Sequence, residues 1–472
     1  MNAAVKSRAM QTSGGFFSLF ELAPAVFKAS ALEDLSRAMG TAELPGSSDN
    51  DSGYVYLGQF ITHDVTKLVP PPDREFVPTV ELVQERTAAL DLDSVYGDGF
   101  HDDTGSVDTT TGKLALGRVI DSSGQPGSED DLPRNANRTP LIGDKRNDEN
   151  LLVAQLHVQF VKLHNYLVDR IYEQQPGLGA EQLFEQARRN LTLYYQEVVL
   201  YDFLRVVLDP AVWEYVIGAN RGTLWNPVRG EMARMPLEFS TAAFRFAHAM
   251  VRPSYTINDH CGVSAQQLFD MTGEGGFGNR NALPETHIVD WNLFFSDPTG
   301  PDERLFRNKA LCIDPTVAIQ VNKSELLAGL DLRAGNRALL PDAQSIVRHI
   351  KAVHPDLARH IRLRALTPGE INPAVRTREG GNIRVFDLLG DSYGFETRSP
   401  LYYYVLAEAY AIHDGERLGP LGSLIVAETL RGLIFLSSPS ILHRDTAALE
   451  IQRTGILRGG RHLRMTDLLS LV

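Results

Sequence analysis

Cysteine and long apolar runs are scarce in this chain. Only Cys261 and Cys312 occur among 472 residues, which excludes a disulfide framework and leaves a single bridge between them open. No stretch approaches the roughly 18 uninterrupted apolar residues of a membrane-spanning helix. Glu21 interrupts the apolar clusters near the N-terminus and no cleavage site follows. We therefore expect a protein without a secretion signal, either cytoplasmic or secreted without a recognisable signal peptide.

An excess of positive charge is also lacking. The chain has 46 Lys and Arg against 59 Asp and Glu, a net charge of −13, which argues against binding of nucleic acid or an anionic membrane. A small-molecule substrate is the favoured class. A glycine-rich phosphate loop, a serine-hydrolase elbow and paired-cysteine zinc motifs are absent. No feature of the sequence indicates an oligomeric state.

Apolar residues recur mostly at helical rather than alternating spacing. One long pattern of this kind covers residues 150–173 and predicts a largely buried helix. Strand patterns are rare, and long polar connections cover residues 40–53 and 98–140. We predict a partly ordered N-terminal extension, 1–50, followed by one mainly α-helical domain, 51–472. Further helices are expected over residues 180–208, 239–251, 314–328, 342–352, 400–412 and 422–436.

The stretch GQFITHDVT, residues 58–66, places a histidine beside an aspartate in a helix-compatible segment. Adjacent side chains on a helix point about 100° apart. His63 and Asp64 are therefore expected to face two different neighbours.

Oxygen donors recur at alternate positions in TAALDLDSVYG, residues 87–97. The donors are Thr87, the backbone carbonyl of Ala89, Asp91 and Asp93. This spacing suits a hard cation such as calcium, and a distant carboxylate such as Asp64 would complete the ligand set. The other interpretation is a loop of solvated acids.

Two more segments carry candidate residues. In AFRFAHAMVRP, residues 243–253, His248 lies in an apolar helical segment that ends at a proline, and it either ligates a metal or is a hydrogen-bonded core histidine. In PLIGDKRNDENLL, Arg146 and Glu149 lie at the start of the long helix, where helix capping alone would explain them.

Taken in their order along the chain, the four segments resemble the animal-type haem peroxidases, including their bacterial members. The resemblance runs from about residue 50 to the C-terminus, where ERLGPLGSLIVAETLRGLI and RMTDLL are also similar. It implies a helical, single-domain peroxidase fold with long loops, a haem b and one calcium ion. It also implies hydrogen peroxide and a small donor as substrates.

The resemblance assigns roles to residues on both sides of the haem. His63 would be the distal histidine that takes a proton from hydrogen peroxide and returns it to the departing oxygen. Arg146 would stabilise negative charge as the O–O bond breaks, and Gln59 would contact water or a small anion above the iron. His248 would be the proximal iron ligand.

For the cation, the resemblance implies that Asp64 turns away from the haem and joins the donors of the 87–97 loop. The implied calcium ligands are Asp64, Thr87, Ala89, Asp91 and Asp93. The resemblance thus implies that His63 faces a haem and that Asp64 faces a calcium ion.

Several positions depart from the family pattern. Thr62 stands where mammalian members have an ester-forming aspartate, and Asn150 stands where one member has a sulfonium-forming methionine. Glu149 matches the second ester-forming carboxylate, so one ester link and a non-covalent haem both stay open. In LDLRAGNRALLP, residues 330–341, Asp331 takes the place of the asparagine bonded to the proximal histidine. A carboxylate there would draw the imidazole toward imidazolate and favour oxidised iron.

A last departure separates two functions. Related fatty-acid oxygenases need a tyrosine three residues before the proximal histidine, and this chain has Arg245 there. We therefore expect a haem peroxidase that reduces hydrogen peroxide and oxidises a halide, thiocyanate or small organic donor. The alternatives are an oxygenase or hydroperoxide-transforming enzyme, and a haem-binding scaffold without turnover. Structural or unassigned roles are expected for the remaining histidines considered: His157, His164, His260, His354 and His360.

Overall fold

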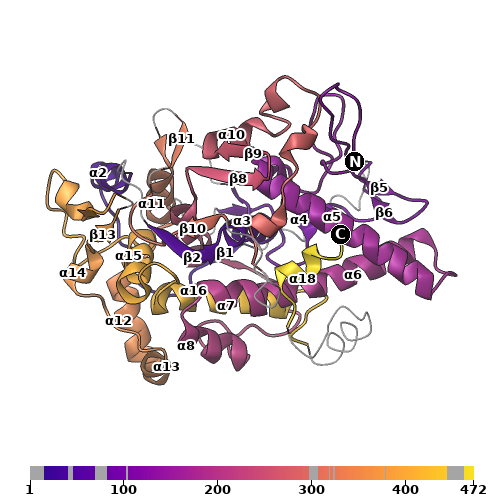
Figure 1. Cartoon of the computed structure of the whole chain (residues 1–472). Helices are drawn as coiled ribbons and strands as arrows, with labels where there is room; N and C mark the ends of the chain where they lie inside the picture. The colour runs from indigo at the N-terminus through magenta and orange to yellow at the C-terminus, as the bar shows by residue number, and fades with distance from the viewer. Residues whose placement is uncertain are drawn as a thin grey trace.

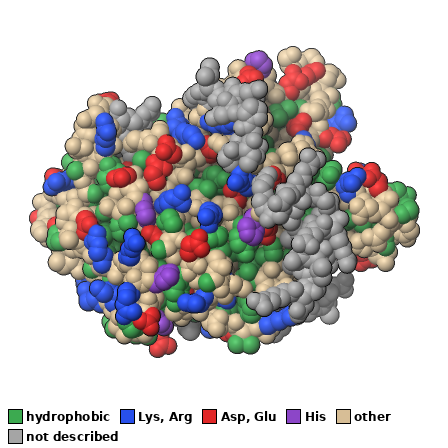
Figure 2. Space-filling model, turned by 60° about the horizontal axis from the view of Figure 1, so that its bottom comes forward, with side chains coloured by type: hydrophobic (Ala, Val, Ile, Leu, Met, Phe, Trp, Pro, Cys, Tyr) green, Lys and Arg blue, Asp and Glu red, His purple; other side chains and the backbone are tan. Residues whose placement is uncertain are grey.

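The fold is mainly helical, as expected. The computed structural model describes residues 15–40, 46–69, 82–102, 105–296, 307–317, 319–322, 325–377, 379–443 and 462–472. Within these residues no helix is both long and apolar enough to span a bilayer. On the face shown in Figure 2, acidic and basic side chains are interspersed.

Long helices form the body of the molecule (Figure 1). α5 (Leu151–Gln174) packs against α6 (Ala180–Val198), and α15 (Leu401–His413) packs against α16 (Pro420–Leu436). α5 begins where the Asn150 side chain accepts a hydrogen bond from the Val153 amide at 3.1 Å, which satisfies one of the free donors at the helix start.

Shorter helices surround this body. The α-helices are α2 (Ala29–Met39), α3 (Gly53–Val65), α4 (Asp93–Tyr96), α7 (Leu204–Val207), α8 (Pro210–Trp213), α9 (Leu237–Ser240), α10 (Ala265–Asp270), α11 (Leu327–Arg337), α12 (Ala343–Val353), α13 (Pro355–His360), α14 (Pro368–Ile371) and α18 (Met465–Leu469). The 3₁₀ and π turns are η2 (Lys145–Asp148), η3 (Val199–Phe203), η4 (Glu214–Gly218), η5 (Ala243–Met250), η6 (Gly276–Gly278), η7 (Glu285–His287), η8 (Trp291–Leu293) and η9 (Val385–Leu388).

Strands in the described residues form two-stranded sheets only. β1 (Phe16–Phe17) pairs with β7 (Met235–Pro236) in parallel. The antiparallel pairs are β2 (Ser47–Asp51) with β10 (Lys309–Leu311), β3 (Leu68–Val69) with β4 (Val83–Gln84), β5 (Val107–Asp108) with β6 (Lys113–Leu114), β8 (Ser254–Asn258) with β9 (Cys261–Ser264), β11 (Gln320–Asn322) with β12 (Glu325–Leu326), and β13 (Val375–Arg376) with β14 (Asn382–Ile383).

The expected helix over residues 314–328 is wrong. Strands β11 and β12 occupy its second half, and the helix α11 begins only at Leu327. Val317, Ile319 and Val321 alternate along this segment, and β-branched residues at a period of two favour a strand. The expected helix over 180–208 is interrupted by the π turn η3, and that over 239–251 consists of α9 and the 3₁₀ turn η5.

The N-terminal residues pack on the helical body where they are described. β1 pairs with β7, and α2 contacts α11. β2 spans the expected boundary near residue 50 and pairs with β10. These contacts attach the segment before α3 to three distant parts of the chain.

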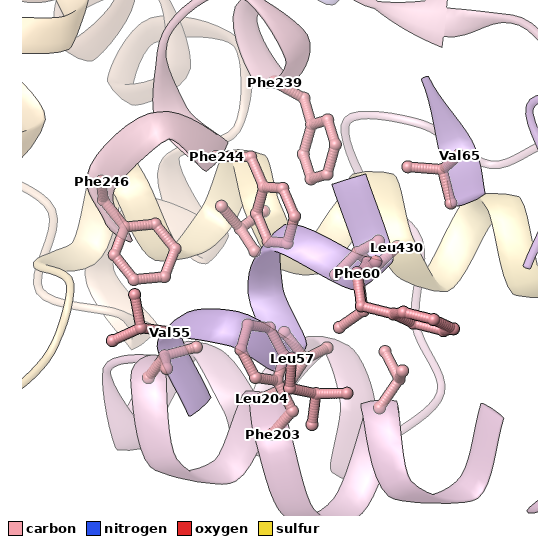
Figure 3. Close-up of a cluster of buried hydrophobic side chains, with 14 of the residues drawn as sticks. Val55, Leu57, Phe60, Val65, Phe203, Leu204, Phe239, Phe244, Phe246 and Leu430 are labelled. Carbon is pink, nitrogen blue, oxygen red and sulfur yellow. The ribbon is translucent and has the colours of Figure 1, made fainter. Parts of the chain in front are cut away.

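The helix α3 lies at the centre of the fold, against α5, η3 and η5. Figure 3 shows its apolar side chains meeting those of neighbouring elements, with Val55, Leu57, Phe60 and Val65 near Phe203, Leu204, Phe239, Phe244, Phe246 and Leu430. At its start, the Gly53 amide donates to the Phe294 carbonyl at 2.9 Å. Burial of this cluster fixes the position of the helix that carries His63 and Asp64.

Two glycines of α3 provide a matched test of this packing. A Cβ at Gly53 would overlap the Phe294 carbonyl and lie 2.6 Å from the Phe295 ring, whereas a Cβ at Gly58 would lie 3.5 Å from the Phe203 ring. We expect Gly53→Ala to lower the free energy of unfolding by about 1–3 kcal/mol through overpacking. Gly58→Ala should be neutral or stabilising by up to about 1 kcal/mol. Urea denaturation measures both, and equal stabilities of the two variants would contradict this packing.

Candidate active site

The face of α3 that carries His63 also carries Gln59. Most residues of α3 are buried, but Gln59 and Thr62, which lie four and one residues before His63, are partly exposed. Positions three and four apart share one face of a helix. The Gln59 side chain is held by Asn150, whose Nδ2 donates to Oε1 of Gln59 at 3.0 Å.

His63 has a hydrogen-bond partner on Nδ1 and a carboxylate near Nε2. Its Nδ1 lies 2.9 Å from Oδ1 of Asn147, and its Nε2 lies 3.6 Å from Oε2 of Glu149. Burial, followed by the nearby Arg146 charge, lowers the pKa of His63 to about 4. The imidazole is therefore neutral near pH 7 and able to accept a proton.

The guanidinium of Arg146 is fixed in one orientation. It pairs with Asp144, with Nη2 to Oδ2 at 2.8 Å, and its Nη1 and Nη2 donate to the carbonyls of Thr66 and His63 at 3.0 Å each. The turn η2 sets this geometry, because the Asp144 side chain caps it by accepting from the Arg146 amide at 2.9 Å. A guanidinium held this way is a preorganised positive charge beside the distal histidine.

The Glu149 carboxyl lies near His63, and its pKa is raised. Its side chain is 47% exposed, yet burial is the largest cause that raises its pKa, while Arg146 and His248 oppose the rise. The cap of α5 is Asn150 rather than Glu149, so helix capping does not account for this carboxylate.

His248 lies on η5, which packs against α3. Its Nδ1 lies 2.6 Å from Oδ2 of Asp331 on α11, and Nη1 of Arg245 lies 2.8 Å from the other carboxylate oxygen. Burial alone would raise the pKa of Asp331, but His248 and Arg245 outweigh burial and lower the pKa. Among the described residues none bonds Nε2 of His248, whose side chain is 35% exposed.

The expected cation ligands largely come together. Oxygens of Asp64, Asp91 and Asp93 lie within 4.8 Å of one another, and Oγ1 of Thr87 is 2.7 Å from Oδ2 of Asp93. The carbonyl of Ala89, in the same loop, stays a predicted ligand. Burial and Asp93 raise the pKa of Asp91 to about 7, and burial raises those of the other two aspartates as well. A hard cation would relieve this repulsion among carboxylates.

Residues that the sequence did not single out connect these parts. Arg86 bridges the two acidic groups, with Nε 2.8 Å from Oδ2 of Asp144 and Nη1 3.4 Å from Oδ1 of Asp93. Asp144 in turn holds Arg146. The acid cluster is thus linked to Arg146 through Arg86 and Asp144. No spacing in the sequence reveals this path, because Arg86 and Asp144 lie in distant segments of the chain.

The remaining residues of interest are also placed. His157 joins the site, because its Nδ1 lies 3.0 Å from Nδ2 of Asn147. His164 does not, since its ring nitrogens bond the Tyr96 hydroxyl and the Gly112 carbonyl. Cys261 and Cys312 are free thiols and form no bridge.

These residues fit a haem. Two histidines approach from α3 and η5, which pack together, and one has its Nδ1 tied to a carboxylate, as metal-binding imidazoles usually do. Gln59 and His248 are partly exposed and Glu149 is exposed, so their side chains have surface available to a bound group. The donor set is thus that of a haem site with one ligating face and one reactive face.

Comparisons with known proteins agree. A family model described as animal haem peroxidase matches residues 65–288. Among curated proteins, peroxidase mlt-7 of Caenorhabditis elegans is 27% identical over 43% of this chain and 28% of its own length. Mouse (Mus musculus) thyroid peroxidase is 27% identical over 65% of this chain and 31% of its own length. The chain therefore spans less than a third of these relatives.

Solved structures share the fold. Peroxidase A of Dictyostelium discoideum superposes with a TM-score of 0.65 at 14% identity, covering 97% of this chain and 92% of that one. Fatty acid α-dioxygenase of Arabidopsis thaliana gives a TM-score of 0.63 at 14% identity, covering 95% and 76%. The family model and the curated relatives support a place in the animal haem peroxidase superfamily, and the solved structures show the same fold.

Proposed function

We propose that this chain is a haem-dependent peroxidase that reduces hydrogen peroxide and oxidises a small donor. The observation that carries the proposal is the grouping of Arg146 and Glu149 beside His63. His248 lies on η5, which packs against α3. Similarity to the superfamily supports the same reaction.

His248 would hold the haem iron through Nε2, since its Nδ1 is bonded to Asp331. A bound haem supplies the two-electron reduction of hydrogen peroxide to water and the oxidising power for the donor. Glu149, 3.6 Å from Nε2 of His63, lies on the distal side, where it would contact the porphyrin edge, either as a free carboxylate or through one ester link.

On the distal side, His63 would accept a proton from hydrogen peroxide at Nε2 and deliver it to the departing oxygen, which leaves as water. Arg146, fixed by Asp144 and two carbonyls, would stabilise the negative charge on that oxygen before the proton arrives. Gln59, on the same face of α3, would position water or a small anion. A halide, thiocyanate or small organic molecule is the donor class.

A fatty-acid oxygenase is the second candidate, because the fold is shared with an α-dioxygenase. Arg245, in the position of the oxygenase tyrosine, is held by Asp331 at 2.8 Å. A guanidinium cannot carry the phenoxyl radical that abstracts hydrogen from lipid. Oxygen uptake with a polyunsaturated fatty acid, in the absence of added peroxide, would favour the oxygenase instead.

Loss of the distal histidine should disable the reaction with peroxide. We expect His63→Leu to slow peroxide consumption by the haem-loaded protein about 10²- to 10⁴-fold, the usual contribution of a general acid–base group. The exposed His260→Gln serves as the control. The rate should stay level down to weakly acidic pH and fall as the pH drops through about 4, because the pKa of His63 is lowered to that value and only the neutral ring accepts a proton. A His63→Leu variant as fast as the control would contradict the proposal.

Calcium at the acid cluster should stabilise the fold. Calcium at about 100 times its Kd should raise the free energy of unfolding by about 2.7 kcal/mol, seen as a higher Tm that a chelator reverses. Asp91→Asn should weaken calcium binding, measured by calorimetry, whereas Asp108→Asn, an exposed acid outside the cluster, should not. A wild-type Tm that is indifferent to calcium and to chelator would exclude the cation site.

The proximal carboxylate should tune the iron. Asp331→Asn removes a negative charge beside His248 and should raise the Fe(III)/Fe(II) reduction potential, whereas Arg245→Gln leaves that charge uncompensated and should lower it. Each change is expected to reach about 60 mV, the one-electron equivalent of about 1.4 kcal/mol. Spectroelectrochemistry measures both, with the exposed Arg359→Gln as control. An unchanged potential in Asp331→Asn would remove Asp331 from this role.

A further inference from the structure

The distal histidine is one end of a chain of two hydrogen bonds. Nδ1 of His63 lies 2.9 Å from Oδ1 of Asn147, and Nδ2 of Asn147 lies 3.0 Å from Nδ1 of His157. All three residues are buried, and they come from α3, η2 and α5. Asn147 and His157 have no part in the steps described above.

The amide atoms of Asn147 in these two hydrogen bonds indicate which nitrogen of each histidine carries the proton. An amide oxygen accepts hydrogen bonds and an amide nitrogen donates them. His63 therefore carries its proton on Nδ1 and has a bare Nε2, and His157 accepts at Nδ1. Nε2 of His63 is also the nitrogen nearest to Glu149, at 3.6 Å. The bare nitrogen thus lies on the side of Glu149, where the proposed function needs a proton acceptor.

We propose that Asn147 and His157 are positioning residues that hold His63 in the tautomer with a bare Nε2. His157 orients the Asn147 amide by accepting from its Nδ2, and the oriented amide oxygen then takes the proton on Nδ1 of His63. This inference rests on the proposed function, because a general base at Nε2 is what the tautomer serves.

The environment of His157 is poorly suited to packing alone. Its Nε2 is buried with no partner among the described residues, and an unmet buried donor costs about 1–3 kcal/mol. A leucine would avoid that cost. Burial lowers the pKa of His157 to about 3, so the ring stays neutral and its Nδ1 remains an acceptor.

His164 is a matched control on the same helix. It is also fully buried, and burial also lowers its pKa, to about 4. Its nitrogens bond the Tyr96 hydroxyl and the Gly112 carbonyl, both at 3.0 Å, away from His63. A substitution at His164 therefore reports what the loss of a buried histidine from α5 does by itself.

The wild-type protein gives the first test. Two-bond ¹H–¹⁵N correlation spectra of ¹⁵N-histidine-labelled, reduced and carbon-monoxide-bound haem protein, which is diamagnetic, distinguish the two neutral tautomers. His63→Gln assigns the signal. We expect His63 in the Nδ1–H form. An Nε2–H form would mean that the Asn147 amide is reversed, and it would overturn the inference.

The second test is the association rate of hydrogen cyanide, which gives its proton to the distal base as it binds iron. His157→Leu should slow association about 10- to 100-fold, as expected for loss of a supporting partner. His157→Asn, whose Oδ1 can replace the Nδ1 acceptor, and His164→Leu should stay within about threefold of wild type. The intensity of the haem absorption band and the far-ultraviolet circular dichroism check that each variant is folded and loaded.

The outcomes separate the two proposals. If His63→Leu binds hydrogen cyanide as fast as the wild type, the proposed function itself is contradicted. A rate that depends on His63 but is equal in His157→Leu and His164→Leu would overturn the positioning role and leave the peroxidase proposal intact.

Discussion

The burial of Asp64 beside His63 is the constraint on which the site depends. One helix, α3, carries the base His63 on one face and the carboxylate of Asp64 on another. Asp64 belongs to the acid cluster with Asp91 and Asp93. Asp64 accepts from the amides of Leu92 and Ser94 at 3.3 and 3.4 Å, which ties α3 to the loop that precedes α4. A buried carboxylate is costly unless its charge is met, so the position of His63 depends on how the charge of Asp64 is balanced.

An ion pair between an aspartate and an arginine lies beside each of the two histidines. Beside His63, Arg146 donates to the His63 carbonyl and Asp144 supports it, and Arg86 connects that pair to Asp93. On the proximal side the order is reversed, with Asp331 touching His248 and Arg245 supporting it. Each histidine thus has a carboxylate–guanidinium pair beside it, and one member of the pair contacts the histidine. The other member balances the charge of the first and fixes its orientation.

The sequence predicted those parts of the structure that local pattern controls. Helical spacing located α5, α12, α15 and α16 to within a few residues. Motif order singled out His63, Arg146 and Glu149, which lie beside one another, and its assignment of site roles to them and to His248 stays a prediction. The helix expected over 314–328 was wrong because alternating β-branched residues were assigned helical spacing. Arg86, Asn147 and His157 were not found as site residues because their roles come from contacts between distant segments, and a pattern of neighbours along the chain does not contain that information.

The central claim is that His63 and His248 face one haem from opposite sides, with His248 as the ligand. The most direct measurement is the absorption spectrum of haem-loaded His248→Gly with and without added imidazole, beside wild type and His63→Gly. The account predicts that the Soret band of His248→Gly is altered and returns to the wild-type position with imidazole, whereas His63→Gly keeps a wild-type iron ligand. A Soret band indifferent to His248, or one restored by imidazole only in His63→Gly, would contradict it.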